Sequence, residues 1–117
     1  MKIVIKGELI DFNKFQNRTR YNKFAGSSIK KIETERVFWE CKKQPLKRIK
    51  KYPVVVNFKW YSKNSRKDLD NVAFSKKFCL DGLVMAGILP NDSRKYVCGF
   101  RDNFFIDKKH PRVEICI

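Results

Sequence analysis

The run Pro53-Val54-Val55-Val56-Asn57-Phe58-Lys59-Trp60-Tyr61 decides the fold of this chain. Its β-branched and aromatic residues favour a strand, and successive side chains of a strand point to opposite faces. One face therefore carries only apolar side chains, which are Val54, Val56, Phe58 and Trp60. We expect this strand to lie in a sheet that has this face covered by helices.

A helix is predicted on each side of this strand. The first begins at Ser27 or Ser28, either of which can cap it, and it runs to about residue 43 because Pro45 closes it. We expect five of its side chains to face the core, namely Ile29, Ile32, Val37, Phe38 and Cys41. The residues before it, 8–26, show no clean period and are expected to form a long basic loop.

The second helix is capped by Asp70 or Asn71 and runs to about residue 86, where Gly87 stops it. Three further strands are expected, at residues 2–6, 96–100 and 112–117, with a charged hairpin-like excursion over 101–111. The resulting order is β-α-β-α-β-β. It predicts one small α+β domain over residues 1–117, in which two helices pack on a small mixed sheet.

Composition narrows the functions open to the chain. Its 117 residues include 27 basic and 12 acidic side chains, for a formal net charge of +15. So large an excess points to a polyanionic partner such as nucleic acid. No apolar run approaches the roughly 18 residues of a membrane span, and no secretion signal follows Met1, so we expect a cytoplasmic protein with no membrane partner.

The cysteines and the histidine do not suggest a metal or nucleophile site. Cys41, Cys79, Cys98 and Cys116 lie too far apart for a C-x-x-C zinc pair, so we expect reduced thiols that pack in the core. The only histidine is His110, which we expect on the surface. A serine–histidine or cysteine–histidine catalytic pair is therefore not expected.

The positive charge lies almost wholly in the first part of the chain. Residues 1–67 hold 19 basic and 5 acidic side chains. Contacts to phosphate position DNA without reading its sequence. Twelve basic side chains are expected to make them: Arg18, Arg20, Lys23, Lys42, Lys43, Lys47, Arg48, Lys50, Lys51, Arg66, Lys67 and Lys76.

Aromatic residues are interleaved with the basic residues of the expected loop. They are Phe12, Phe15, Tyr21 and Phe24. Such rings can stack on unpaired bases, or they can anchor the loop to the core.

Carboxylates follow the basic stretch directly. Asp68 and Asp70 are two apart, so in an extended segment both point to one side, a spacing that suits two ligands of one Mg²⁺ or Mn²⁺. A protein that cuts phosphodiesters needs carboxylates to hold a divalent cation. In a protein that only binds phosphates, the same carboxylates would repel the ligand. On one helix, Asp70, Lys77 and Asp81 would share a stripe. The alternative is a capped helix with a Lys77–Asp81 pair on a solvated face.

Asp92 is the fourth acid of interest. It lies in the run Pro90-Asn91-Asp92-Ser93, where ordinary turn chemistry is the alternative to metal binding. A helix over residues 72–86 would be about 22 Å long and would separate Asp92 from Asp70. Either the chain folds back along the helix, or Asp92 serves a site on a partner subunit.

Together these residues resemble the signature of RusA-type Holliday junction resolvases. The resemblance covers most of the chain and is specific across about residues 66–92. It rests on Arg66-Lys67-Asp68-Leu69-Asp70-Asn71, Lys77, Asp81-Gly82-Leu83, Gly87-Ile88 and Asn91-Asp92, with a similar opening in Gly7-Glu8-Leu9, Asn13, Arg18 and Arg20. It implies a homodimeric, Mg²⁺-dependent endonuclease that nicks four-way DNA junctions symmetrically and occurs in bacteria and their phages.

The resemblance also implies roles for particular residues. The metal-binding aspartates would be Asp68, Asp70 and Asp92. Lys77 would be the catalytic lysine, which stabilises the negative charge that develops on the phosphate. Compared with the family's pattern, this chain has three extra residues between Asn71 and that lysine. Lys76 is therefore a second candidate for the role. Asn91 stands where the family has the first aspartate of a pair, so one possible ligand is lost.

Two other readings stay open. Asp92 followed by Asp107-Lys108-Lys109 loosely matches an Asp…(Asp/Glu)-x-Lys pattern and would move the nuclease site. Alternatively, the chain is a non-catalytic basic module that binds nucleic acid tightly and gives no Mg²⁺-dependent product.

Overall fold

The valine-rich run forms the strand that joins the two halves of the sheet. In the computed structural model, which describes residues 1–117, β2 (Val54–Ser62) pairs parallel with β3 (Val97–Ile106) and antiparallel with β4 (Arg112–Cys116). β1 (Lys2–Lys6) pairs antiparallel with the other side of β4, so the order is β1-β4-β2-β3. The predicted mixed sheet and α+β class are confirmed.

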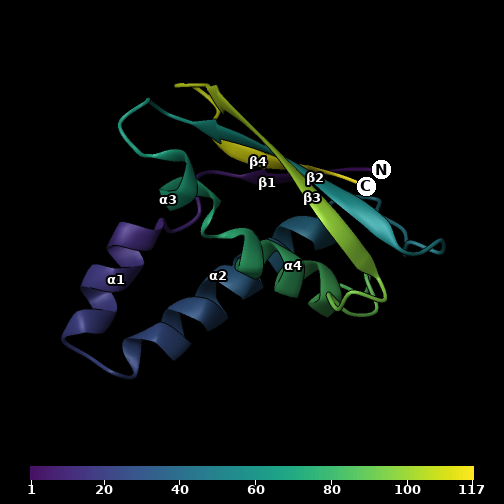
Figure 1. Cartoon of the computed structure of the whole chain (residues 1–117), viewed down its shortest axis with the longest axis horizontal. Coiled ribbons are helices and arrows are strands. Elements are labelled where there is room, and N and C mark those ends of the chain that lie inside the picture. Colours follow the sequence, from purple (N-terminus) through teal and green to yellow (C-terminus); the bar gives the residue numbers. More distant parts are fainter.

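Alternation along the strands separates a buried face of the sheet from an open one. Val56, Phe58 and Trp60 are buried, as predicted, and Val54 is half-buried. Phe58 lies opposite Ile115, and Ile115 lies opposite Ile3, so one apolar face continues across three strands. The helices cover this face, and the two chain ends lie side by side at one end of the molecule (Figure 1).

The expected basic loop over residues 8–26 is wrong in part, because it contains a helix. α1 (Phe12–Arg20) begins at Asp11, whose Oδ1 accepts a hydrogen bond from the Lys14 N–H at 2.8 Å. No residue of α1 is fully buried, and its apolar side is short, since Phe12 and Phe15 are its only large apolar residues. The following helix, α2 (Ala25–Lys42), starts two to three residues earlier than predicted.

The core side of α2 is narrower than expected. Ile29, Val37 and Cys41 are buried as predicted, whereas Phe38 is half-buried and Ile32 is 62% exposed. α2 lies beside α4 on the covered face of the sheet, and its first turns extend beyond the sheet toward α1 (Figure 1).

The predicted continuous helix after residue 70 is two helices. α3 (Leu69–Ala73) and α4 (Lys76–Met85) are separated by a turn at Phe74-Ser75. The Phe74 ring packs against Phe12, with 5.2 Å between centroids, and Ser75 is buried. Because of this break, Asp70 does not share one helix stripe with the residues of α4.

The strand predicted at residues 96–100 is also longer than expected. β3 continues to Ile106, so most of the expected excursion over 101–111 is strand, and only a short turn leads to β4. β3 stays paired with β2 from Asn57–Arg101 to Ser62–Ile106. Its charged sequence hid this, because β3 is an edge strand with mostly exposed side chains.

The cysteines follow the expectation only in part. Cys41 and Cys79 are buried, and burial raises the pKa of both thiols, that of Cys41 to about 11. Cys116 is half-buried, whereas Cys98 is exposed on β3, which corrects its expected place in the core. His110 is exposed, as predicted. None of the helices is both long and apolar enough to cross a membrane.

A close approach of two helices generates the first prediction. At Gly82 in α4, a Cβ atom would collide with the Val37 side chain of α2 and lie 3.2 Å from the Thr34 carbonyl oxygen. Gly82→Ala should therefore lower the free energy of unfolding by about 1–3 kcal/mol, because the helices must separate. Urea denaturation measures the loss. Gly99→Ala, where the nearest atom would be 3.8 Å away, is the control, and an equal loss there would contradict the packing argument.

Candidate functional site

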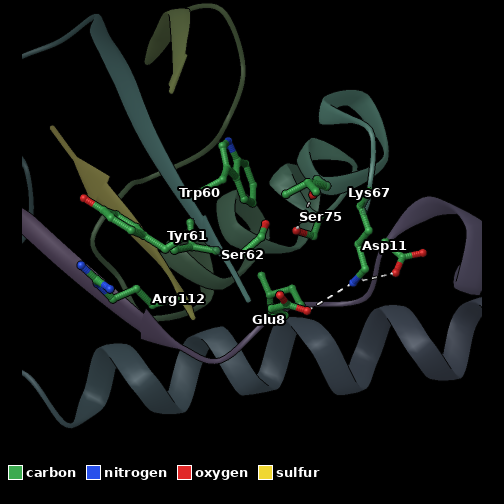
Figure 2. A pocket seen from close by; sticks show the side chains of 11 residues that line it. Glu8, Asp11, Trp60, Tyr61, Ser62, Lys67, Ser75 and Arg112 are labelled. Carbon is green, nitrogen blue, oxygen red and sulfur yellow. Dashed lines mark hydrogen bonds and ion pairs between the residues drawn. The ribbon is translucent and has the colours of Figure 1, made fainter. Parts of the chain in front are cut away.

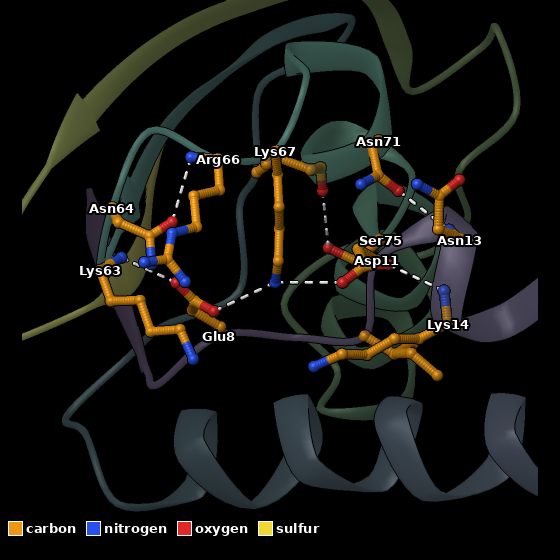
Figure 3. Close-up of polar contacts among 12 residues, drawn as sticks. Glu8, Asp11, Asn13, Lys14, Lys63, Asn64, Arg66, Lys67, Asn71 and Ser75 are labelled. Carbon is orange, nitrogen blue, oxygen red and sulfur yellow. Dashed lines mark hydrogen bonds and ion pairs between the residues drawn. The ribbon is translucent and has the colours of Figure 1, made fainter.

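Asp68 and Asp70 lie where residues 63–68 lead into α3, and this segment, residues 63–71, is called the α3 loop below. It is tied to the segment after β1. Glu8 Oε1 accepts a hydrogen bond from the Lys63 N–H at 2.7 Å, and Asn71 Oδ1 accepts one from the Asn13 N–H at 2.9 Å. Between these points the Lys67 side chain reaches inward (Figure 3). Its Nζ lies 3.2 Å from Glu8 Oε2 and 3.0 Å from Asp11 Oδ2.

This Glu8–Lys67–Asp11 clamp is partly shielded from solvent. The Asp11 and Lys67 side chains are 5% and 22% exposed. Burial alone would raise the pKa of Asp11, but hydrogen bonds from the Lys14 N–H and from Lys67 outweigh it, and the pKa is lowered. Burial would lower the pKa of Lys67, but its bonds to Asp11 and Glu8 raise it. All three groups are charged at neutral pH.

The clamp changes the role expected of Lys67. Its ammonium group is used inside the molecule, so it is not placed to hold DNA as predicted. Glu8 is among the residues that carry the resemblance, whereas Asp11 was not identified from the sequence. Its signal was an aspartate directly before a helix, since Asp is a preferred N-cap residue.

Lys67 and Asp68 are adjacent, and their side chains have opposite fates. Lys67 is clamped, whereas Asp68 and Asp70 are exposed and neither carboxylate accepts a hydrogen bond or forms an ion pair. Asp68 occupies the N-cap position of α3, yet its side chain caps no N–H. Of the twelve acidic side chains, only Glu35, Asp68 and Asp70 have no ion pair.

Lys77 forms a second charged cluster with two aspartates. Its Nζ lies 2.9 Å from Asp81 Oδ1, the predicted pair within one helix, and 2.7 Å from Asp92 Oδ2. The hydrogen bond to Asp92 is the main cause of the raised pKa of Lys77, and it lowers the pKa of Asp92 in turn. The chain therefore folds back along α4, which is the first of the two alternatives predicted for Asp92.

The three aspartates expected to bind metal are not gathered. No group of three or more histidine, cysteine, aspartate and glutamate side chains lies close enough to hold an ion. The reason is that Asp92 is held by Lys77, while Asp68 and Asp70 stay on the α3 loop. The three aspartates therefore do not form one ligand set within the chain. Asp68 and Asp70 remain exposed and unpaired, but Asp70 lies inside α3, so the extended segment expected to turn both carboxylates to one side is not formed. Mg²⁺ is usually held by one or two carboxylates with waters and substrate phosphates.

Lys76 is no longer a rival to Lys77. Its Nζ lies 2.7 Å from Asp102 Oδ2 on β3 and 4.5 Å from the Phe100 ring centroid, and the side chain is 21% exposed. Asp102 also accepts a hydrogen bond from Trp60 Nε1 at 2.8 Å. Lys76 therefore joins α4 to the sheet and is not free to bind DNA as predicted. The Lys77 side chain is 55% exposed.

Ten of the twelve predicted DNA-binding side chains are exposed. They are Arg18, Arg20, Lys23, Lys42, Lys43, Lys47, Arg48, Lys50, Lys51 and Arg66. Lys43 pairs with Glu40, and the others form no ion pair. Most of them fall into two groups at opposite ends of α2, which at 18 residues is about 27 Å long. Each group can contact a different stretch of a polyanion.

The alternative nuclease site at the β3–β4 turn is occupied by structural contacts. Asp107 Oδ2 lies 2.8 Å from Arg112 Nη1, and Asp107 Oδ1 accepts a hydrogen bond from the His110 N–H. Arg112 also lies over the Tyr61 ring, at 3.7 Å from the centroid. Asp107 therefore stabilises the turn.

A small cavity lies between the clamp and the sheet. Figure 2 shows it between Glu8, Lys67, Ser75 and Trp60. Its volume of about 20 Å³ is room for about one water molecule, so it is not a substrate pocket.

Comparison with known proteins adds no identification. No family model matches the chain, and no curated protein matches it. The resolvase resemblance consequently rests on the residues quoted for it.

The clamp generates a second prediction, on stability. Lys67→Met leaves the buried Asp11 carboxylate without its cation and should lower the free energy of unfolding by about 2–3 kcal/mol near pH 7. Because the folded-state pKa values of Asp11 and Glu8 are lowered, this stabilisation is present above the ordinary carboxyl pKa near 4 and is lost as the pH falls through the folded values.

Urea denaturation at a series of pH values measures this effect. The gap between wild type and Lys67→Met should be widest at pH 6–8 and should shrink toward about pH 3. Lys31→Met is the control, because Lys31 is exposed and forms no ion pair, so this substitution removes one lysine charge away from the clamp. An equal loss in both variants, or a gap that does not depend on pH, would argue against the clamp.

Proposed function

We propose that this chain is a Mg²⁺-dependent endonuclease that resolves four-way DNA junctions by paired, symmetric nicks. The observation that carries the proposal is the unpaired state of Asp68 and Asp70. In a chain with 27 basic side chains, nine of the twelve acids have a cationic partner, and these two neighbours do not. A free carboxylate pair on an electropositive surface is suited to a divalent cation.

The substrate class follows from the charge of the surface. A net charge of +15, with exposed basic groups at both ends of α2, favours a polyanion longer than a nucleotide. The RusA-type signature over residues 66–92 supports branched DNA as that polyanion. It also supports a cytoplasmic protein of a bacterial host, encoded by the host, a phage or a prophage.

Each residue of the site has an assigned part in the proposed reaction. Asp68 and Asp70 would hold the Mg²⁺, which on binding supplies an activated water and polarises the phosphate. The clamp keeps the α3 loop in place, with both carboxylates turned outward. Lys77 is held by Asp81 and Asp92, but its side chain is 55% exposed, so its ammonium group could stabilise charge on a bound phosphate by exchanging one of these carboxylates for it.

Two copies of the chain would act together. A four-way junction has near two-fold symmetry, and two symmetric nicks require two sites. We therefore propose a homodimer with one Asp68–Asp70 pair in each subunit.

The main test is a cleavage assay on a labelled four-way junction, with Mg²⁺ or EDTA. Wild type should give paired nicks in Mg²⁺ and none in EDTA. Asp70→Asn should lose cleavage by at least 100-fold while it keeps or increases junction binding, because removal of a carboxylate relieves repulsion with phosphate.

Glu35→Gln is the matched control, since Glu35 is the third acid without an ion pair but lies on α2, away from the α3 loop. It should cut at the wild-type rate. Equal cutting by wild type and Asp70→Asn would overturn the assignment of the pair. Equally fast cutting of linear duplex would remove the resolvase role and leave a nuclease.

A second candidate function is a non-catalytic DNA-binding module, which the basic surface alone would support. It is distinguished by tight, salt-sensitive binding with no Mg²⁺-dependent product.

For either function, Lys50→Ala with Lys51→Ala should weaken binding to duplex and junction alike. The double variant should also lower the slope of log affinity against log salt by up to about 2, measured by fluorescence anisotropy. An unchanged slope would show that these lysines do not contact phosphate.

A further inference from the structure

We infer that the tip of the α1–α2 hairpin is a stacking site for unpaired bases at the branch point of DNA, with Tyr21 and Phe24 as the stacking rings. This inference rests on the proposed function and names the part of the molecule that would distinguish branched DNA from linear duplex. Of the four aromatic residues in this segment, the structure separates these two from Phe12 and Phe15.

Phe12 and Phe15 are used within the protein. The Phe74 ring lies 5.2 Å from Phe12 and 5.0 Å from Phe15, and the Phe78 ring lies 6.5 Å from Phe15. Together they fix the base of the hairpin to the turn between α3 and α4. These two rings therefore anchor α1.

Tyr21 and Phe24 have no such use. They are 87% and 69% exposed, the two highest values among the large hydrophobic side chains of the chain, and neither ring packs on another ring. They lie where α1 ends and α2 begins, at the corner farthest from the sheet (Figure 1). Both rings are therefore available to a partner outside the chain.

The turn that presents the rings is ordered. The Asn22 side chain accepts a hydrogen bond from the Phe24 N–H at 2.9 Å, and its carbonyl oxygen accepts one from the Ala25 N–H at 3.1 Å. At Gly26, an added Cβ would lie 3.4 Å from the Thr19 side chain, so the two helices pack closely just behind the turn. The rings are thus held at the end of a defined hairpin, which reduces the entropy lost on binding.

The charge around the rings identifies the partner. Residues 12–32 contain six basic and no acidic side chains. Arg18 and Arg20 occupy the last turn of α1, and Lys23 Nζ lies 5.1 Å from the Phe24 ring centroid. None of these three cations forms an ion pair. Aromatic rings among free cations suit single-stranded nucleic acid, in which bases stack on the rings and phosphates bind the cations.

The hairpin also connects this surface to the proposed catalytic loop. The Asn13 N–H bonds to Asn71, next to Asp70, so α1 starts beside that loop and leads away from it to the rings. The nine residues of α1 span about 14 Å. Base faces are covered by their neighbours in a linear duplex and become accessible where strands exchange, so a tip at this distance favours substrates with a branch near the cut.

The test measures DNA binding in EDTA, without any need for cleavage. The probes are a four-way junction with 2-aminopurine at the branch point and a linear duplex of equal length. Tyr21→Ala with Phe24→Ala should weaken junction binding about ten-fold or more and should abolish the change in 2-aminopurine fluorescence, with duplex binding altered less than two-fold. Trp39→Ala is the control, because Trp39 is 61% exposed but lies far along α2 from the tip.

The outcomes separate this inference from the proposed function. Junction binding that is unchanged in the double variant, or equal losses on junction and duplex, would overturn the stacking site and leave the Asp70→Asn test of the nuclease untouched. Vesicles of anionic phospholipid form a third arm. Loss of vesicle binding by the double variant, with junction binding intact, would assign the tip to a membrane surface and overturn the inference. Thermal melting shows that each variant is folded.

Discussion

The ion pairs of Lys67 are the constraint on which the rest of the site depends. One ammonium group bridges Glu8 and the buried Asp11, and so it joins the loop before α3 to the segment that leads into α1. Asp11 also caps α1. The Asp11 carboxylate therefore fixes both the start of α1 and, through Lys67, the position of the α3 loop. Since Lys67 turns inward, its neighbour Asp68 is left on the surface.

The contrast between paired and unpaired acidic side chains supports the proposed cation site. Most carboxylates pair with a lysine or arginine, and several of these pairs join separate elements, as in Lys76–Asp102 and Lys77–Asp92. Asp68 and Asp70 are exceptions in a chain that has cations to spare. A divalent cation from solution is the partner that would satisfy them, and in the proposed complex that cation would also bind a phosphate of DNA. We base the proposed endonuclease on this contrast.

In the proposed complex with DNA, the hairpin connects this site to the branch point. Its base is fixed by packing of Phe12 and Phe15 on Phe74, while its tip carries Tyr21 and Phe24 in solvent. Aromatic residues thus have two uses within thirteen positions, and packing on another ring separates them. An anchored base with an exposed tip allows one part of DNA to be held while another is placed at the carboxylates.

The sequence by itself determined the α+β class, the four-stranded mixed sheet and its buried face, because strand alternation is a local pattern. Spacing also predicted the Lys77–Asp81 pair, because the two residues lie four positions apart on one helix. Only the tertiary structure decided that α1 is a helix, that the helix after Asp70 breaks at Phe74, and that Asp92 meets Lys77 and not the other aspartates. Each of these depends on a partner distant in sequence, and residue spacing carries no information about which distant side chain satisfies a buried ring or a charge.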